Sequence, residues 1–128
     1  MDKKDLYDNF EYIDYSKAKI LHSQNLNEDE IIYIKLLNKR LNNLNKVIFN
    51  SNFTPIFITQ IKFDGLAEKR MYLVNEEIKK FVKKNKYKII PLDELIEEMS
   101  VGDFFDEVHT TISGSKKIAN VIYKNLQW

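Results

Sequence analysis

Hydrophobic positions after residue 27 follow a helical spacing before they change to short apolar runs. Asn27 and Glu30 form a predicted capping box at the start of a helix. The apolar face of this helix is formed by Ile34, Leu37, Leu41, Leu44 and Ile48. The turn-prone segment "NSNFTP" ends the helix, because Pro55 resists its continuation. Residues 1–27 carry aromatic side chains without clear alternation, and their structure stays undecided.

Two short apolar runs predict strands that are buried on both faces. The first is "PIFIT", which is followed by the polar Gln60, and the second is "YKIIPL". Between them, residues 66–85 form a predicted helix whose inward face is Leu73, Val74, Ile78, Phe81 and Val82. A short helix "DELIEEM", which Asp93 starts, follows the second strand. The last helix covers about residues 112–125, with Ile118, Ala119, Ile122 and Leu126 pointing inward.

The order of these elements predicts one α/β domain over residues 1–128. Strands that alternate with helices of this length form a parallel sheet through right-handed crossovers. In such sheets the active crevice lies outside the carboxyl ends of the strands. Gln60 follows the first strand, and the loop that holds Asp106 and His109 comes after the second strand. We therefore expect both to open on one edge of the sheet.

Composition narrows the class of protein. The chain has no cysteine, which excludes disulfides, thiolate metal ligands and a cysteine nucleophile. No apolar run is long enough to cross a bilayer, and the N-terminus does not resemble a secretory signal. We expect a cytoplasmic protein with no membrane partner. The net charge of +1 gives no field to recruit nucleic acid, and the lysines of the second helix read as a solvated face (Lys79, Lys80, Lys83 and Lys84).

The segment "DFFDEVHTTISGSKKIA" carries the candidate chemistry. Asp106 precedes His109 by three positions, which lets the carboxylate orient the imidazole as in an acid–base pair. The same spacing also suits an Asx-turn that leads into a helix and leaves the histidine exposed. A metal site formed by Asp103, Asp106 and His109 is a further alternative. His22 has no comparable neighbours, and we interpret it as structural.

Several segments together resemble the SGNH (GDSL-type) hydrolase family. They are "TQ" after a buried strand, the long helix, "YKIIPLDEL" and "DEVHTTISGSKKIA" before the terminal helix. In that family the last sequence block is Asp-x-x-His, often followed by a Thr, a Gly and a helix. The resemblance covers residues 31–128. It implies a flavodoxin-like three-layer arrangement, with Asp106 as the triad acid, His109 as the general base and Gln60 as a residue that lines the pocket.

The family's nucleophile block has no counterpart in this sequence. No Gly-Asp-Ser tripeptide occurs, and Ser16 has no glycine or tight turn before it. The resemblance therefore implies the C-terminal half of an SGNH fold. The nucleophile and the oxyanion hole would then come from a missing N-terminal half or from a second copy of the chain.

Two functions follow from this interpretation. The first is hydrolysis of an ester, in an acylated small molecule or carbohydrate, by a Ser-His-Asp mechanism without a metal or cofactor. The second is a catalytically inactive SGNH-like interaction module, in which mutation of His109 would leave function intact.

Overall fold

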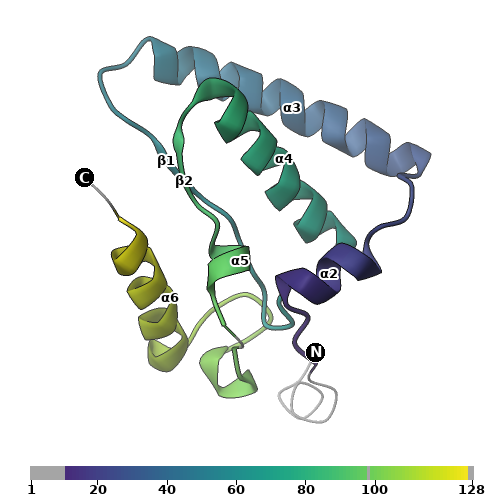
Figure 1. The fold of residues 1–128 in the computed structure, drawn as a ribbon, viewed down its shortest axis with the longest axis vertical. Helices are drawn as coiled ribbons and strands as arrows, with labels where there is room; N and C mark the ends of the chain where they lie inside the picture. Colours follow the sequence, from purple (N-terminus) through teal and green to yellow (C-terminus); the bar gives the residue numbers. More distant parts are fainter. Residues whose placement is uncertain (1–10, 98, 127–128) are drawn as a thin grey trace.

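The described part of the chain contains a long helix pair, a small parallel sheet and a C-terminal helix, together with shorter helices (Figure 1). The structure is a computed structural model, and it describes residues 11–97 and 99–126. In chain order the elements are α2 (Tyr15–Leu21), α3 (Glu28–Phe49), β1 (Ile56–Ile58), α4 (Lys69–Asn85), β2 (Lys88–Ile90), α5 (Leu92–Leu95), the 3-10 helix η1 (Val101–Asp103) and α6 (Ile112–Asn125).

The two predicted strands form a parallel pair. Ile56 lies opposite Lys88, and Ile58 lies opposite Ile90. The helix α4 connects β1 to β2, which confirms the mixed α/β class and the parallel pairing expected from the element order. Among the described residues the sheet consists of these two strands, so the flavodoxin-like arrangement of three layers stays a prediction.

Side chains of β1 enter hydrophobic clusters on both faces of the sheet, because successive residues of a strand point to opposite sides. Phe57 packs with Leu41 of α3 and Phe81 of α4, and its ring stacks on Tyr87 at a centroid distance of 6.0 Å. Ile58 packs against the second cluster, which consists of Tyr12, Phe63, Leu92, Ile96, Met99 and Phe104. The apolar run "PIFIT" is therefore explained by contacts on both sides of the strand.

The start of α3 is the predicted capping box. The side chain of Asn27 accepts a hydrogen bond from Glu30 N at 2.8 Å, and Glu30 Oε1 accepts one from Asn27 N at 2.9 Å. These bonds satisfy two backbone donors that the first turn of a helix leaves without partners. Along the helix Leu41 and Ile48 are buried, whereas Leu44, which we expected on the same face, is 43% exposed.

The helix α4 begins at Lys69, later than the expected residue 66. Gly65 has a φ of +67°, and Leu66 is fully buried with its N–H donating to Ile13 O at 2.9 Å. A positive φ of this size is a conformation that glycine adopts readily and other residues rarely. The segment before α4 is thus hydrogen-bonded to Ile13, and the helix begins further along the chain, at Lys69.

The undecided N-terminal segment contains the helix α2. Its N-cap is Asp14, whose side chain accepts a hydrogen bond from Lys17 N at 2.9 Å. Ala18 is fully buried on this helix. The aromatic residues around Asp14 obscured a capping signal that was already present in the sequence.

The inward face of α6 differs from the expectation. Gly114 is buried, and Ile118 and Val121 pack against the second hydrophobic cluster, whereas Ala119 is exposed. A Cβ atom at Gly114 would lie 2.1 Å from the carbonyl oxygen of Asp103. The helix therefore turns its glycine toward η1, and Ala119 falls outside the face that this contact defines.

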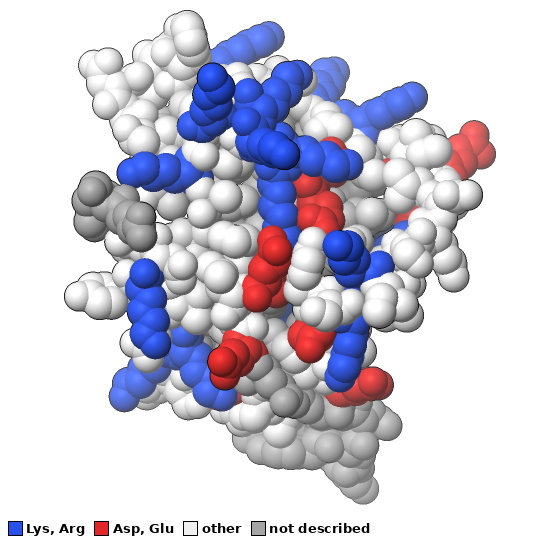
Figure 2. Space-filling model, in the orientation of Figure 1, with Lys and Arg blue, Asp and Glu red and all other residues white. Residues whose placement is uncertain are grey.

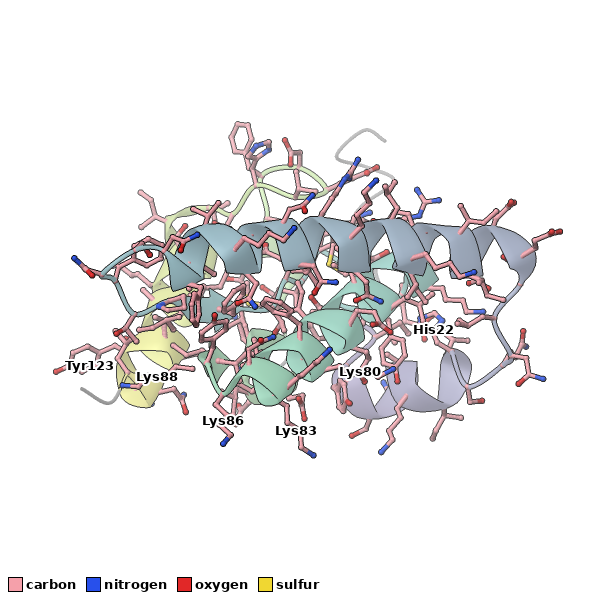
Figure 3. The ribbon with its side chains drawn as sticks, turned by 90° about the horizontal axis from the view of Figure 1, so that it is seen from above. His22, Lys80, Lys83, Lys86, Lys88 and Tyr123 are labelled. Atoms are coloured by element: carbon pink, nitrogen blue, oxygen red, sulfur yellow. The ribbon has the colours of Figure 1, made fainter. Side chains whose placement is uncertain are left out.

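Basic side chains gather over the upper part of the face seen in Figure 2. In Figure 3 the labelled Lys80, Lys83 and Lys86 lie along one side of the molecule, and all three are exposed. The expectation that Lys79 shares a solvated face with Lys80, Lys83 and Lys84 is wrong. The side chain of Lys79 is 17% exposed, and its ammonium group lies 2.8 Å from carboxylate oxygens of Asp93 and Glu94.

No helix among the described residues has both the length and the apolar character needed to span a membrane.

Candidate active site

The Asp106–His109 segment lies in a short hairpin between η1 and α6. Phe104 and Thr110 form an antiparallel bridge, and Phe105 N donates a hydrogen bond to His109 O at 2.7 Å. The hairpin is also joined to the loop after β1, since Phe63 N donates to Glu107 O at 3.1 Å. The backbone therefore fixes the hairpin at both of its strands and near its tip.

Asp106 and His109 form a direct pair. The distance from His109 Nδ1 to Asp106 Oδ2 is 2.7 Å. The other carboxylate oxygen accepts hydrogen bonds from Val108 N at 2.9 Å and from His109 N at 2.8 Å. The Asp106–His109 spacing therefore gives both an Asx-turn and an Asp–His contact, because one carboxylate oxygen closes the turn while the other contacts the imidazole.

Hydrogen bonding keeps the Asp106 carboxylate ionised. The N–H groups of His109 and Val108, followed by the imidazole, lower the pKa of Asp106 to about 2. An ionised carboxylate only accepts hydrogen bonds, so a neutral His109 must carry its proton on Nδ1. Its Nε2 atom then holds a free lone pair, and no hydrogen bond joins this atom to any described residue. The imidazole has the tautomer that a general base requires.

Among the described residues, no serine or threonine hydroxyl is hydrogen-bonded to this imidazole. All of the chain's serines and threonines lie within the described residues, and none of them donates a hydrogen bond to His109. Thr110 pairs with Ser115 at 2.7 Å, and Thr111 donates to Gly102 O at 2.9 Å. Ser16 lines a different hollow of about 440 Å³ together with Tyr15, Asp93 and Glu94. The described part of the chain therefore contains an Asp–His pair without a serine or threonine hydrogen-bonded to its imidazole.

Gln60 is exposed at the carboxyl end of β1, as the sequence predicted. Its backbone is held by Asn75, whose side chain accepts from Gln60 N at 3.0 Å and donates to Gln60 O at 2.7 Å. Asn75 is fully buried and was missed by the sequence reasoning. Its signal was a lone amide within the apolar face of α4. No hydrogen bond joins the described Gln60 side chain to Asp106 or His109.

Asp103 does not join the Asp106–His109 pair. Its side chain is 1% exposed and contacts Ser100, Ser113 and Lys117. Within residues 11–97 and 99–126 no group of three or more acidic or histidine side chains is placed to hold a metal ion. The alternative of a metal site at Asp103, Asp106 and His109 therefore has no support in the geometry.

His22 belongs to a different part of the molecule. Its Nε2 atom lies 2.8 Å from Leu66 O, and its ring packs against Tyr72 at a centroid distance of 5.3 Å. A carbonyl oxygen only accepts, so the neutral His22 ring carries its proton on Nε2. Figure 3 shows His22 at the end of the molecule remote from Tyr123 of α6. The two histidines of the chain are thus held in opposite tautomers.

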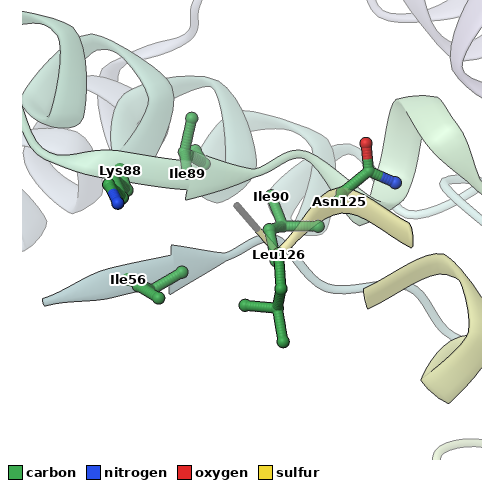
Figure 4. Close-up of a pocket in the computed structure, with 6 residues that line it drawn as sticks. All are labelled: Ile56, Lys88, Ile89, Ile90, Asn125 and Leu126. Carbon is green, nitrogen blue, oxygen red and sulfur yellow. The ribbon is translucent and has the colours of Figure 1, made fainter. Parts of the chain in front are cut away.

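Two hollows lie on either side of the C-terminal part of α6. One, of about 250 Å³, is lined by Ile56, Lys88, Ile89, Ile90, Asn125 and Leu126 (Figure 4). The other, of about 500 Å³, lies between α5 and α6 and includes Leu95, Lys117 and Asn120. Asp106 and His109 line neither of them, so these hollows give no substrate pocket for the pair.

The geometry of the Asp106–His109 pair sets the chemistry available at this site. The pair has an ionised acid, an oriented imidazole and an open Nε2 atom. No protein-family model matches the chain, and neither the curated proteins nor the solved structures give a significant match.

Proposed function

We propose that Asp106 and His109 are the acid and the base of an SGNH-type hydrolase that acts on ester bonds. The observation that carries the proposal is the 2.7 Å contact between His109 Nδ1 and Asp106 Oδ2, which leaves Nε2 without a hydrogen bond to any described residue on a largely exposed side chain. The substrate is an ester in an acylated small molecule or carbohydrate. The Asp-x-x-His block before a Thr, a Gly and a helix supports the family, and the parallel β1–β2 pair is compatible with a flavodoxin-like three-layer fold.

In this mechanism the Nε2 atom of His109 removes the proton from a serine hydroxyl as the hydroxyl attacks the ester carbonyl. The Asp106 carboxylate stabilises the imidazolium that forms, and His109 then returns the proton to the leaving alcohol. Water repeats the same sequence to release the acid. An ionised Asp106 is already in the required state at neutral pH, since its pKa is about 2.

The nucleophile comes from a second copy of the chain or from a further polypeptide segment that completes the fold. The sheet supports this part of the proposal. Among the described residues β1 pairs with β2 alone, and Ile56, Phe57 and Ile58 are each only half-buried. An apolar strand with an unpaired edge favours the addition of another strand. The assembled protein would work in the cytoplasm without a nucleic-acid partner, a membrane partner or a cofactor.

Hydrolysis of a short-chain p-nitrophenyl ester over a range of protein concentrations tests the proposal. Turnover that saturates with substrate and is lost in both His109→Ala and Asp106→Asn would support it. His22→Gln is the matched control and should keep the activity. Saturation matters because an exposed imidazole can itself attack an activated ester. Turnover that survives in His109→Ala would contradict the proposal.

The second candidate function is a catalytically inactive SGNH-like interaction module. One observation favours it, because every serine and threonine of the chain lies among the described residues and none of them donates a hydrogen bond to His109. Absence of turnover at all protein concentrations would favour this module over a hydrolase built from copies of the chain. Its binding function would then be unchanged in His109→Ala.

A further inference from the structure

Asp103 is the most highly connected carboxylate beside the candidate site. Its side chain is buried, and Oδ2 accepts hydrogen bonds from Ser100 N at 2.7 Å and from Lys117 Nζ at 2.5 Å. Ser100 Oγ donates to the same oxygen at 3.1 Å, and Ser113 Oγ donates to Oδ1. Lys117 and these hydrogen bonds hold the pKa of Asp103 below its ordinary range, although burial acts in the opposite direction. The carboxylate therefore joins η1 to two turns of α6.

The backbone of Asp103 closes the hairpin that carries His109. Thr111 N donates to Asp103 O at 2.9 Å, so the two ends of the segment 103–111 are bonded to each other. Gly114 packs directly on the same carbonyl group, where a Cβ atom would lie 2.1 Å from the oxygen. The first turn of α6 thus sits on Asp103 through main-chain contact, and the side-chain contacts keep the two in place.

The imidazole depends on this closure. The Asp106 and His109 side chains are 51% and 74% exposed, so little packing of their own holds them. Their contact is set by the hairpin backbone, in which Phe105 N donates to His109 O at 2.7 Å. If the two ends of the hairpin moved apart, the direction in which His109 Nδ1 points toward Asp106 would change.

We propose that Asp103 is a positioning residue that holds the His109 imidazole on Asp106 by fixing both ends of the hairpin. This inference rests on the proposed function, because the orientation matters for catalysis only if His109 is the base. Asp103 acts through η1, Thr111 and α6, and its side chain bonds to Ser100, Ser113 and Lys117 rather than to the imidazole. The first residue of "DFFDEVH" then serves the same imidazole as the second aspartate, one through the backbone and the other by direct contact.

The tautomers of the two histidines provide the test. In the ¹⁵N-labelled chain at about pH 8.5, where an ordinary histidine is neutral, ring nitrogen resonances distinguish an Nδ1–H from an Nε2–H imidazole. In the unaltered chain His109 should be the Nδ1–H form and His22 the Nε2–H form. Asp103→Asn should abolish the preference of His109 for Nδ1–H while His22 keeps its own form. Glu107→Gln removes one negative charge from the same hairpin and should change the tautomer of neither histidine.

Asp103→Asn can unfold the chain, in which case His22 would also lose its tautomer. Ser113→Ala and Lys117→Met then decide, since each removes one donor to Asp103 and leaves the others. A shift of His109 away from Nδ1–H in a folded variant supports the proposal. A folded Asp103→Asn, or folded Ser113→Ala and Lys117→Met, in which His109 stays Nδ1–H would overturn it and reduce Asp103 to a stabilising contact. The measurement needs no turnover, so it is independent of the ester assay.

Discussion

Lys79 Nζ lies 2.8 Å from Asp93 Oδ2, and this ion pair joins α4 to α5 beside the carboxyl end of β1. Asp93 is fully buried at its side chain and also accepts a hydrogen bond from Thr59 Oγ1 at 2.6 Å. The ammonium group lies 4.2 Å from the centre of the Tyr15 ring, which brings α2 to the same contact. Burial alone would lower the pKa of Lys79, but the carboxylates of Asp93 and Glu94 outweigh it and raise that pKa. Lys79 is therefore charged at neutral pH.

Replacement of Lys79 by methionine should destabilise the fold by about 3 kcal/mol, because it leaves the buried Asp93 carboxylate without its countercharge. Lys80→Met is the matched control. Lys80 is the next residue of α4, its side chain is 75% exposed, and its partner is Glu77 at 3.3 Å. Its loss should cost less than about 1 kcal/mol. Urea unfolding of both variants measures the two free energies, and equal losses would show that the Lys79 network adds nothing beyond a surface ion pair.

Gly114→Ala should destabilise the chain by about 2 kcal/mol or more, since its methyl group would overlap the Asp103 carbonyl and separate α6 from η1. The better helix propensity of alanine offsets only part of this cost. Gly102→Ala is the control, because a Cβ atom there meets only Ser100 Oγ at 3.8 Å. Thermal unfolding should therefore show a large decrease in Tm for the first variant and little change for the second. A Gly114→Ala protein as stable as the unaltered one would contradict the close approach.

Asp64→Asn should stabilise the protein near neutral pH. The Oδ1 atom of Asp64 is buried without a hydrogen-bond partner, and burial raises the pKa of this carboxyl above its ordinary value. A raised carboxyl pKa in the folded state means that ionisation opposes folding, so the cost grows as pH rises through that pKa. The advantage of the asparagine variant in urea unfolding should be small at acidic pH and larger at neutral pH. The exposed Glu97 offers a control as Glu97→Gln, which should show no such trend.

Local signals in the sequence identified most elements but not the contacts between them. The capping box at Asn27 and the apolar runs of β1 and β2 depend on neighbouring residues, and they predicted these elements correctly. The start of α4 and the burial of Lys79 depend on Ile13 and Asp93, which lie far away in sequence. Periodicity along one helix cannot reveal such partners.

In the candidate site, too, local contacts could be predicted from the sequence and contacts between distant residues could not. The Asp106–His109 contact is local, and its spacing was sufficient to predict it. The role of Asp103 was not predicted beyond an alternative metal site, because its hydrogen bonds to Ser113 and Lys117 form only when α6 packs on η1. Asn75 was overlooked for a similar reason, since its partner is the backbone of Gln60 at the end of β1.

The Asp106 carboxylate should make the stability of the protein depend on pH in a narrow acidic range. Its pKa is about 2 in the folded chain, against an ordinary value of 3.8. A carboxyl whose folded pKa is depressed contributes stability that is present above the unfolded pKa and is lost as pH falls through the folded one. The contribution of Asp106 should therefore be complete above about pH 5 and disappear between about pH 4 and pH 2. Other carboxyls, including Asp103, titrate in the same range, so the comparison requires a variant of Asp106 itself.

Asp106→Asn is suited to this comparison because its amide oxygen can still accept from Val108 N and His109 N and keep the turn. The substitution removes only the charge and the contact with His109 Nδ1, since an amide group has no second oxygen to accept a hydrogen bond from Nδ1–H. The difference in urea midpoint between the two proteins should be constant at neutral pH and shrink as pH falls from about 4 to about 2. The ¹³C resonance of the Asp106 carboxyl gives the pKa directly and should have its midpoint at about 2. A midpoint near 3.8 would show that the carboxylate does not hold the backbone and the imidazole in solution, and the acid–base pair would lose its geometric basis.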